Sequence, residues 1–242
     1  MKVMAFQSEA ADIIEQTKRY FRHREEIFGG ELFFTRSGVL AAVQTSDDRT
    51  LEAFRESIQD CQKCPLARSR KRFVFGSGHS AARLVLVGEA PGRDEDLRGE
   101  PFVGAAGQLL EKILAAIGFR RDEVFIGNIL KCRPPDNRDP LPEEIALCVP
   151  HLKKQIDIIR PRIILTLGRI AAQVLMETTE SLTQLRGRVH DYLGISVLAT
   201  YHPAALLRNA EWKRPVWEDV QRLRRLYDEI VGDKPKWNPP KK

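Results

Sequence analysis

Four cysteines in the chain are spaced like the ligands of one metal centre. Cys61 and Cys64 are separated by two residues, and Cys132 and Cys148 follow as a second pair. The sequence begins without an apolar signal segment, so we expect a cytoplasmic protein, where clustered cysteines bind metal more often than they form disulfides. Sites built only from thiolates hold tetrahedral zinc or an iron–sulfur cluster. The spacing leaves both open, as well as four unrelated buried cysteines, and prolines near the ligands slightly favour iron–sulfur.

A second group of reactive side chains follows an apolar run at Leu84–Gly88. The glycine–proline loop after this run contains four carboxylates within eight residues, Glu89, Asp94, Glu95 and Asp96. The loop lacks the Gly-x-Gly-x-x-Gly of dinucleotide-binding folds and the Gly-Lys-Ser/Thr of a P-loop. A polar turn would also explain the acidic residues, but their density at a strand end makes the loop a candidate for chemistry.

Three uncharged side chains are candidates for ligand recognition. Asn128 lies within an apolar strand, where its amide is costly unless it caps a loop or contacts a ligand. His202 follows another strand and is fixed by the next residue, a proline. That makes it a better site candidate than His23, His79, His151 or His190. Phe102 lies in a glycine-bounded loop, where ordinary core packing is the alternative interpretation.

Apolar runs and helical patterns alternate along the chain and would position these residues. Strands are predicted at 84–88, 124–130, 162–167 and 195–200, and helices at 107–117, 142–159, 169–176 and 212–231. Strands that are apolar on both faces indicate a three-layer α/β/α fold with a central four-stranded parallel sheet. Sites of such sheets lie at the carboxyl ends of the strands, where Glu89, Asn128 and His202 fall.

The domain organisation follows from changes in composition. We expect an N-terminal extension of unknown role at residues 1–50, with a helix at 10–28 and a strand at 32–43. The main domain would span 51–233 and begin with a short helix at 51–60. A tail rich in proline and lysine, residues 234–242, is expected to fray.

Bulk charge and hydropathy restrict the partners. The net charge of +6 and the isoelectric point of about 9.2 mildly favour a polyanionic partner such as nucleic acid. No run approaches the roughly 18–20 apolar residues of a membrane span. We therefore expect no membrane association, and a monomer is the default expectation.

Together these motifs resemble the family 4 uracil-DNA glycosylases, which carry a 4Fe–4S cluster. The matching elements are the four cysteines, Gly-Glu-Ala-Pro-Gly with the following Glu-Asp, Pro-Phe-Val-Gly, Asn-Ile-Leu-Lys-Cys-Arg-Pro-Pro and Tyr-His-Pro-Ala. They occur in the family's order between Cys61 and Asp219, about two thirds of the chain. The resemblance implies hydrolysis of the N-glycosidic bond of deoxyuridine in DNA, with release of uracil as the first step of base excision repair.

The resemblance also implies roles for individual residues. Phe102 would stack on the flipped uracil, Asn128 would hydrogen-bond to its O4 and N3–H, and His202 would face O2. Either Glu89 or Glu95 would handle the attacking water. Exclusion of thymine needs a group near C5 of the base; Gly92 is too small, and our hypothesis is that Glu95 supplies it. The backbone that lines the pocket would be that of Gly88, Glu89, Ala90 and Pro91, and the ligands of the cluster would be Cys61, Cys64, Cys132 and Cys148.

Apolar and basic residues beside these motifs are expected to contact DNA. Leu206 and Leu207 would wedge into the gap left by the flipped nucleotide while Arg208 meets phosphate, although a helix packing face would also explain the two leucines. A basic loop follows the first cysteine pair, and we hypothesise that a structural cluster braces it against the DNA backbone. Its residues are Arg68, Arg70, Lys71 and Arg72.

Two other function classes use the same cysteines. One is an iron–sulfur electron carrier or redox sensor, and the other is a non-catalytic DNA-binding module. The redox hypothesis does not explain Asn128, His202 or the acidic loop. The DNA-binding module would carry Asn128 and His202 without releasing a base, and the glycosylase is the preferred hypothesis.

Overall fold

The computed structural model describes residues 34–35, 38–39 and 50–238. The helix predicted at 10–28 lies outside the described residues. Within the strand predicted at 32–43, two short strands, β1 (Phe34–Thr35) and β2 (Gly38–Val39), pair in antiparallel orientation. The remainder forms one α/β unit around a larger sheet.

Six strands form this sheet in the order β3-β5-β4-β6-β8-β7. The four inner strands are the predicted parallel sheet: β5 (Phe125–Asn128), β4 (Leu84–Gly88), β6 (Ile163–Leu167) and β8 (Ile195–Thr200). The prediction omitted two antiparallel edge strands, β3 (Ser77–Gly78) and β7 (His190–Tyr192). Strands of two or three residues give no apolar run for the sequence to show.

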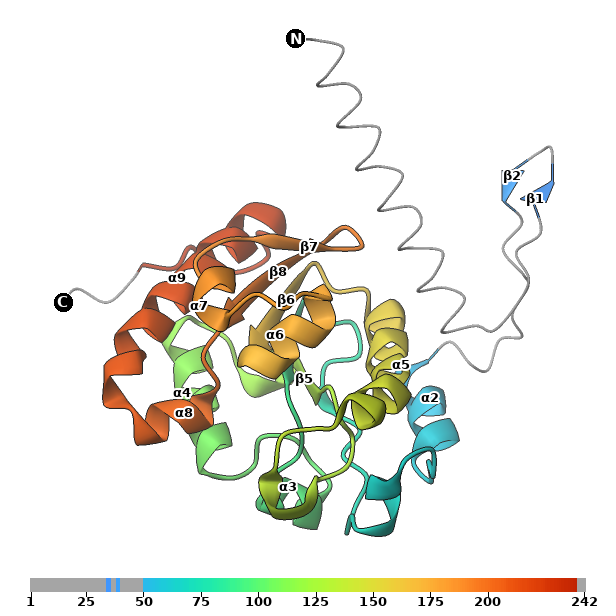
Figure 1. Cartoon of the computed structure of the whole chain (residues 1–242). Helices are drawn as coiled ribbons and strands as arrows, with labels where there is room; N and C mark the ends of the chain where they lie inside the picture. The colour runs from blue at the N-terminus through green and yellow to red at the C-terminus, as the bar shows by residue number, and fades with distance from the viewer. Residues whose placement is uncertain (1–33, 36–37, 40–49, 239–242) are drawn as a thin grey trace.

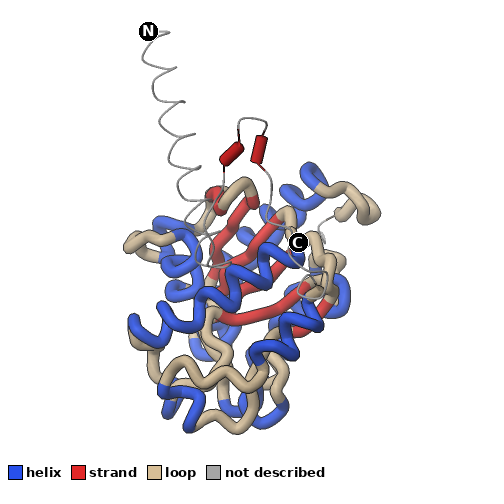
Figure 2. Tube along the Cα trace, turned by 90° about the vertical axis from the view of Figure 1, so that its right-hand side faces the viewer, coloured by secondary structure: helices blue, strands red, loops and turns tan. Residues whose placement is uncertain are grey.

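Helices cover both faces of the sheet, as Figures 1 and 2 show. The helices predicted at 142–159 and 169–176 are confirmed at their predicted bounds, and α3 and α8 arise where loops were expected. The α-helices are α2 (Leu51–Ile58), α3 (Arg93–Arg98), α4 (Ala105–Ala116), α5 (Pro142–Ile159), α6 (Arg169–Met176), α7 (Leu182–Leu185), α8 (Pro203–Arg208) and α9 (Lys213–Ile230). The 3₁₀ turns are η1 (Pro65–Arg68), η2 (Arg121–Glu123), η3 (Pro135–Asn137) and η4 (Ala210–Trp212).

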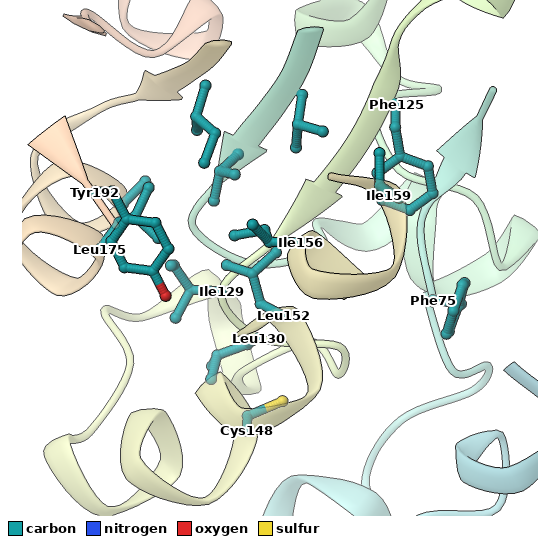
Figure 3. Close-up of a cluster of buried hydrophobic side chains, with 14 of the residues drawn as sticks. Phe75, Phe125, Ile129, Leu130, Cys148, Leu152, Ile156, Ile159, Leu175 and Tyr192 are labelled. Carbon is teal, nitrogen blue, oxygen red and sulfur yellow. The ribbon is translucent and has the colours of Figure 1, made fainter. Parts of the chain in front are cut away.

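Side chains of the central strands alternate between two cores, which is why these strands are apolar throughout. Val85 and Val87 of β4 join the core formed with α5 and α6, shown in Figure 3. Leu84 and Leu86 join the core formed with α4 and α9. Cys148 lies at the edge of the first core in Figure 3, so the second cysteine pair is attached to the same rigid layer as the sheet.

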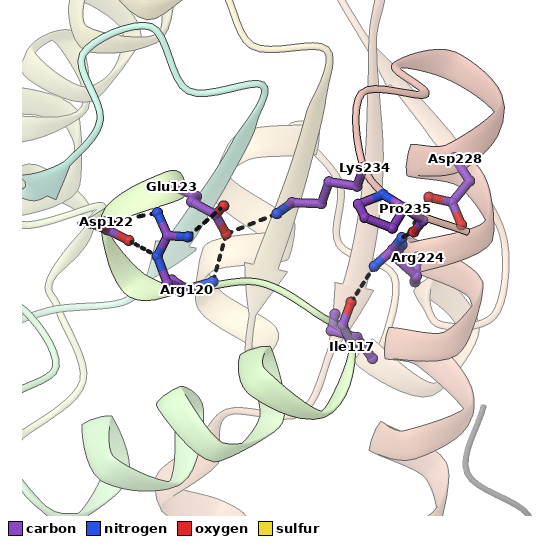
Figure 4. Close-up of polar contacts among 8 residues, drawn as sticks. All are labelled: Ile117, Arg120, Asp122, Glu123, Arg224, Asp228, Lys234 and Pro235. Atoms are coloured by element: carbon purple, nitrogen blue, oxygen red, sulfur yellow. Dashed lines mark hydrogen bonds and ion pairs between the residues drawn. The ribbon is translucent and has the colours of Figure 1, made fainter. Parts of the chain in front are cut away.

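The first part of the C-terminal tail packs against the domain, which corrects the expectation that it frays. Lys234 donates to Glu123 at 2.8 Å, and the carbonyl of Pro235 accepts from Arg224 at 2.5 Å (Figure 4). The indole of Trp237 donates to the carbonyl of Ala116 at 3.1 Å. Residues 234–237 therefore link α9 to the end of α4, on polar contacts that a composition-based prediction cannot anticipate.

Among the described residues, no helix is long and apolar enough to cross a bilayer.

Candidate active site and cysteine centre

A cavity of about 380 Å³ opens where the carboxyl ends of β4, β5 and β8 meet. It brings together the three uncharged candidates and the loop after β4, as the strand-end argument predicts. Its lining residues are Glu89, Ala90, Pro91, Gly92, Glu95, Phe102, Ala106, Asn128, Pro134, Asn137, Arg138, Asp139, His202, Ala204, Ala205 and Arg208.

Asn128 lines this cavity and carries an unpaired acceptor. The residue ends β5 and is 2% exposed. Its Oδ1 is buried and has no hydrogen-bond partner among the residues that the structure describes. A buried polar atom without a partner costs about 1–3 kcal/mol, so such an atom in a cavity points to a ligand that donates a hydrogen bond.

Gly88 makes room for this arrangement from the neighbouring strand. A Cβ at this position would lie 2.4 Å from Asn128 Oδ1 and 2.8 Å from the ring of Phe102. Any side chain at this strand end would therefore fill the space that the amide and the ring share. The sequence predicted Gly88 as part of the pocket wall, and in the structure it lies behind the two recognition side chains.

Phe102 is held in an unusual backbone conformation. Its φ is +53°, in the left-handed region that residues with a Cβ seldom occupy, and its ring is buried. Arg121 donates to the carbonyls of both Pro101 and Phe102, with 3.0 Å to the latter. Gly107 allows α4 to approach this turn, because a Cβ there would lie 1.8 Å from the Phe102 carbonyl oxygen. The loop is thus fixed from two sides.

His202 has a defined tautomer. It caps α8, and its Nδ1 accepts a hydrogen bond from the backbone N–H of Ala204 at 3.2 Å. Nε2 must then carry the proton of the neutral ring. Burial lowers the pKa of His202 to about 4, with Glu95 opposing this shift and Arg208 adding to it. The ring centroid lies 5.4 Å from that of Phe102, so a neutral N–H donor stands beside the aromatic face.

The four carboxylates after β4 have different tasks. Both oxygens of Glu95 are engaged by backbone amides: one accepts from Gly92, and the other accepts from Val103 at 2.9 Å and Gly104 at 3.0 Å. Asp96 is buried and accepts from the amides of Lys71 and Arg72. Most of the acidic run therefore caps α3 and joins loops.

Glu89 is the carboxylate whose environment suits proton transfer. It lines the cavity, and burial raises its pKa, as does the nearby Asp139, while Arg169 acts in the opposite direction. Asp139 accepts a hydrogen bond from Arg169 at 3.1 Å. Sequence reasoning missed Asp139 and Arg169, because the two residues lie 30 positions apart and no local pattern joins them.

The residues after His202 separate into buried and exposed positions. Leu206 is 3% exposed and belongs to the core against α4 and α9, which corrects the expectation that it reaches DNA. Leu207 is 54% exposed, and Arg208 lines the cavity. One helical turn thus offers a single apolar side chain and one guanidinium near the pocket.

The side chains of the basic loop also face in different directions. Arg68, Lys71 and Arg72 are exposed. Arg70 instead faces the cysteines: its guanidinium donates to the carbonyl of Cys61 at 2.8 Å and to Cys132 Sγ at 3.2 Å. This placement corrects the assignment of Arg70 to the DNA-facing group.

Electrostatic interactions link the four cysteines. Charges on Cys61 and Cys64 act on Cys132, and those on Cys132 and Cys64 act on Cys148. Burial raises the pKa of Cys132, against the effect of Arg70, and raises that of Cys148 to about 12. Such thiols ionise when a metal replaces the proton.

The surroundings of the thiols fit an anionic iron–sulfur cluster. N–H donors lie against the sulfurs: Arg70 at Cys132, and the backbone amide of Lys131 at Cys148 Sγ, 3.3 Å away. His151 Nε2 is 3.4 Å from Cys61 Sγ. Within the described residues, no three His, Cys, Asp or Glu side chains are arranged around a single ion.

Comparisons with known proteins identify relatives of the chain. The model of the uracil DNA glycosylase superfamily matches residues 75–221. The chain is 43% identical over 185 residues to a type-4 uracil-DNA glycosylase of Archaeoglobus fulgidus, covering 73% of this chain and 93% of that protein. It is 48% identical over 178 residues to the type-4 enzyme of Pyrobaculum aerophilum, covering 70% and 91%. The type-4 enzyme of Thermotoga maritima is 43% identical over 181 residues, covering 73% and 94%.

Proposed function

The chain belongs to the uracil-DNA glycosylase superfamily and, within it, to the type-4 enzymes, and on that basis we propose that it hydrolyses the N-glycosidic bond of deoxyuridine in DNA and releases uracil. The observation that carries the proposal is the unpaired, buried Oδ1 of Asn128, a residue that lines the cavity beside the neutral His202. A cytoplasmic location is part of the proposal, because a reducing compartment keeps thiols available as ligands.

Asn128 supplies the selectivity for uracil. Uracil presents a donor at N3 and an acceptor at O4, which match the Oδ1 and Nδ2 of one amide group. Cytosine presents an acceptor at N3 and a donor at its exocyclic amine, so the same amide would be mispaired in a buried site. Sites that depend on such hydrogen bonds reject the wrong partner by roughly 10⁴-fold or more. Phe102 stacks on the base and fixes its plane.

His202 stabilises the leaving group. Cleavage leaves an oxocarbenium-like sugar and a uracil anion whose charge gathers largely on O2. A preorganised N–H at that oxygen lowers the barrier by about 2.7–4 kcal/mol. The neutral ring with its proton on Nε2 supplies this donor without a prior protonation step.

Glu89 handles the water. Glu95 is occupied by three backbone amides, whereas Glu89 lines the cavity with a pKa raised by burial. In its ionised form Glu89 accepts a proton from the attacking water and offsets positive charge on the sugar. Glu95 positions the Phe102 loop and lines the pocket, where it restricts space near uracil C5.

The cysteine centre would hold a 4Fe–4S cluster through Cys61, Cys64, Cys132 and Cys148. When bound, the cluster supplies a structural crosslink rather than a reactant, because it joins the segment before the basic loop to α5 and to the segment after β5. Arg68, Lys71, Arg72 and Arg208 then meet DNA phosphates, and Leu207 fills the gap left by the flipped nucleotide.

The experiment that tests this proposal compares the wild type with Asn128→Asp on oligonucleotides that contain one uracil, with cytosine and thymine controls. We expect the wild type to release uracil alone and the variant to lose at least tenfold of its preference for uracil over cytosine, as expected when one buried hydrogen bond is mispaired. Unchanged selectivity in the variant would contradict the assignment of Asn128. Binding of DNA without base release by cluster-loaded wild-type protein would favour a non-catalytic module.

A further inference from the structure

Lys131 has a charged side chain that is completely enclosed between the pocket and the cysteine centre. It follows β5, three residues after Asn128 and one before Cys132, and is 0% exposed. Lysine is seldom fully buried, because its ammonium loses hydration unless other groups replace the water. None of the steps assigned above uses this side chain.

The ammonium holds the backbone of the base-recognising residue. Lys131 Nζ donates to the carbonyl oxygen of Asn128 at 2.9 Å and to Gln155 Oε1 at 2.6 Å. Gln155 is also fully buried, and its Nε2 donates to the carbonyl of Phe75 at 2.8 Å. The ammonium therefore ties the end of β5 to α5 and to the segment after the basic loop.

The backbone of Lys131 strengthens the same junction. Its carbonyl accepts from the amide of Val74 at 2.9 Å, and its own amide donates to Cys148 Sγ. The two preceding residues continue the pairing with β4, because the amide of Leu130 donates to the carbonyl of Glu89 at 3.0 Å. A shift at Lys131 would thus move Asn128 and Glu89 together.

Both hydrogen-bond acceptors of the ammonium are neutral oxygens of the protein. Because the ammonium is fully buried, these two hydrogen bonds replace the water that it loses, and removal of either one is costly.

We propose that Lys131 is a positioning residue that orients Asn128 for uracil, and that Gln155 holds its ammonium in place. This inference rests on the proposed function. The backbone amide of Lys131 donates to Cys148 Sγ, and its ammonium donates to the Asn128 carbonyl. Lys131 therefore links the cysteine segment to the residue whose side-chain amide must keep its angle.

Lys131→Met tests the inference, because methionine has a similar length but no charge or donor. The control is Lys153→Met. Lys153 is a second buried lysine; it lies on α5 and forms an ion pair with Glu177. Cluster-loaded proteins would be compared by the dissociation constant for free uracil and by the single-turnover rate with excess enzyme. If active enzyme remains in excess over its ligand or substrate in both measurements, the dissociation constant and the rate do not depend on the fraction of enzyme molecules that are active. Visible absorption and iron content would report the cluster independently.

We expect Lys131→Met to weaken uracil binding and slow excision by about tenfold or more, the size expected for a lost hydrogen bond from a charged donor. Lys153→Met should stay within about twofold, as for an exchange outside the network. Gln155→Met keeps the hydrogen bond from Lys131 to the Asn128 carbonyl but removes the one from Lys131 to Gln155. It should therefore weaken uracil binding and slow excision by less than Lys131→Met does. The same variant tests the inference if Lys131→Met fails to fold.

Wild-type uracil affinity and rate in folded, cluster-loaded Lys131→Met or Gln155→Met would overturn the inference. So would a loss confined to iron content. Failure of the wild type to release uracil is a separate result, and it would overturn the proposed function instead.

Discussion

The pocket and the cysteine centre both include residues at or just after the end of β5, yet they suit bound groups of different charge. In the pocket, Asn128 offers an unpaired oxygen and His202 a neutral N–H, which fit an uncharged base. Around the cysteines, the guanidinium of Arg70 and the amide of Lys131 lie against sulfur, which fits an anionic group. Lys131 stands between the two regions.

This difference shows how one strand end serves two purposes. The pocket leaves a polar atom without a hydrogen-bond partner, so that a bound molecule can supply one. The cysteine centre instead surrounds its sulfur atoms with hydrogen-bond donors. The first arrangement favours turnover, because the ligand must leave, and the second favours retention. The experiments below alter one region at a time and ask whether the other responds.

The largest effect is expected from Glu89→Gln in the pocket. Loss of a general base typically costs about 10²–10⁴ in rate, measured under single-turnover conditions. Burial raises the pKa of Glu89 in the folded protein, so its charged form destabilises the fold and stability falls as pH rises from the ordinary carboxyl pKa to the raised one. The variant should therefore gain unfolding free energy at neutral pH, and the gain should vanish below the ordinary carboxyl pKa of about 4.

Glu95→Gln is the matched control for this prediction. Its carboxylate caps α3 and the Phe102 loop, so we expect a loss of stability in urea unfolding. Slower excision with Glu95→Gln than with Glu89→Gln would reverse the assignment of the two carboxylates.

His202→Ala should slow excision by about 10²–10³, because one donor to a developing anion is lost. The pKa of about 4 keeps the ring neutral above that pH, so the acid limb of the wild-type pH–rate profile should belong to Glu89. His202→Ala should retain this limb at a lower rate, and Glu89→Gln should abolish it. Equilibrium DNA binding should be unchanged in His202→Ala; a parallel loss of binding would argue against a role confined to the leaving group.

At the cysteine centre, Arg70→Met should shorten the lifetime of the cluster while the excision rate per cluster-loaded molecule stays within about threefold. The guanidinium donates to Cys132 Sγ and the Cys61 carbonyl, and hydrogen-bond partners of metal ligands typically change metal affinity by about 10–100-fold. The decay of visible absorption in the presence of a chelator measures the lifetime of the cluster. Unchanged decay would show that this donor does not stabilise the centre.

The smallest effect is expected on the exposed side of the same loop. Replacement of Arg68, Lys71 and Arg72 by glutamine should weaken DNA binding and flatten its dependence on salt. The slope should fall by about 0.7–0.9 for each phosphate that the protein no longer neutralises. Arg70→Met should leave the slope unchanged, because this side chain faces the cysteines. Equal slopes in all variants would mean that the loop is only solvated.

The sequence predicted the elements whose signal is long and local. The helices at 142–159 and 169–176 and the strand at 195–200 have the predicted bounds, because apolar periodicity and Pro142 at a helix start mark them. The short edge strands and α3 were missed: the strands have two or three residues, and the start of α3 depends on Glu95 accepting from backbone amides.

Within the site, strand-end position identified Asn128 and His202, since carboxyl ends of parallel strands must meet. The sequence could not choose between Glu89 and Glu95, because the partners of Glu95 lie in another loop, at Val103 and Gly104. The direction of Arg70 and the burial of Leu206 likewise depend on tertiary contacts that have no local pattern.

The most direct test of the central claim is release of free base from an oligonucleotide that contains one deoxyuridine, by the full chain prepared anaerobically with its cluster. We expect uracil to be released and neither thymine nor cytosine from matched controls. No release of uracil from this cluster-loaded protein would contradict the account and leave a DNA-binding or redox module as the better description.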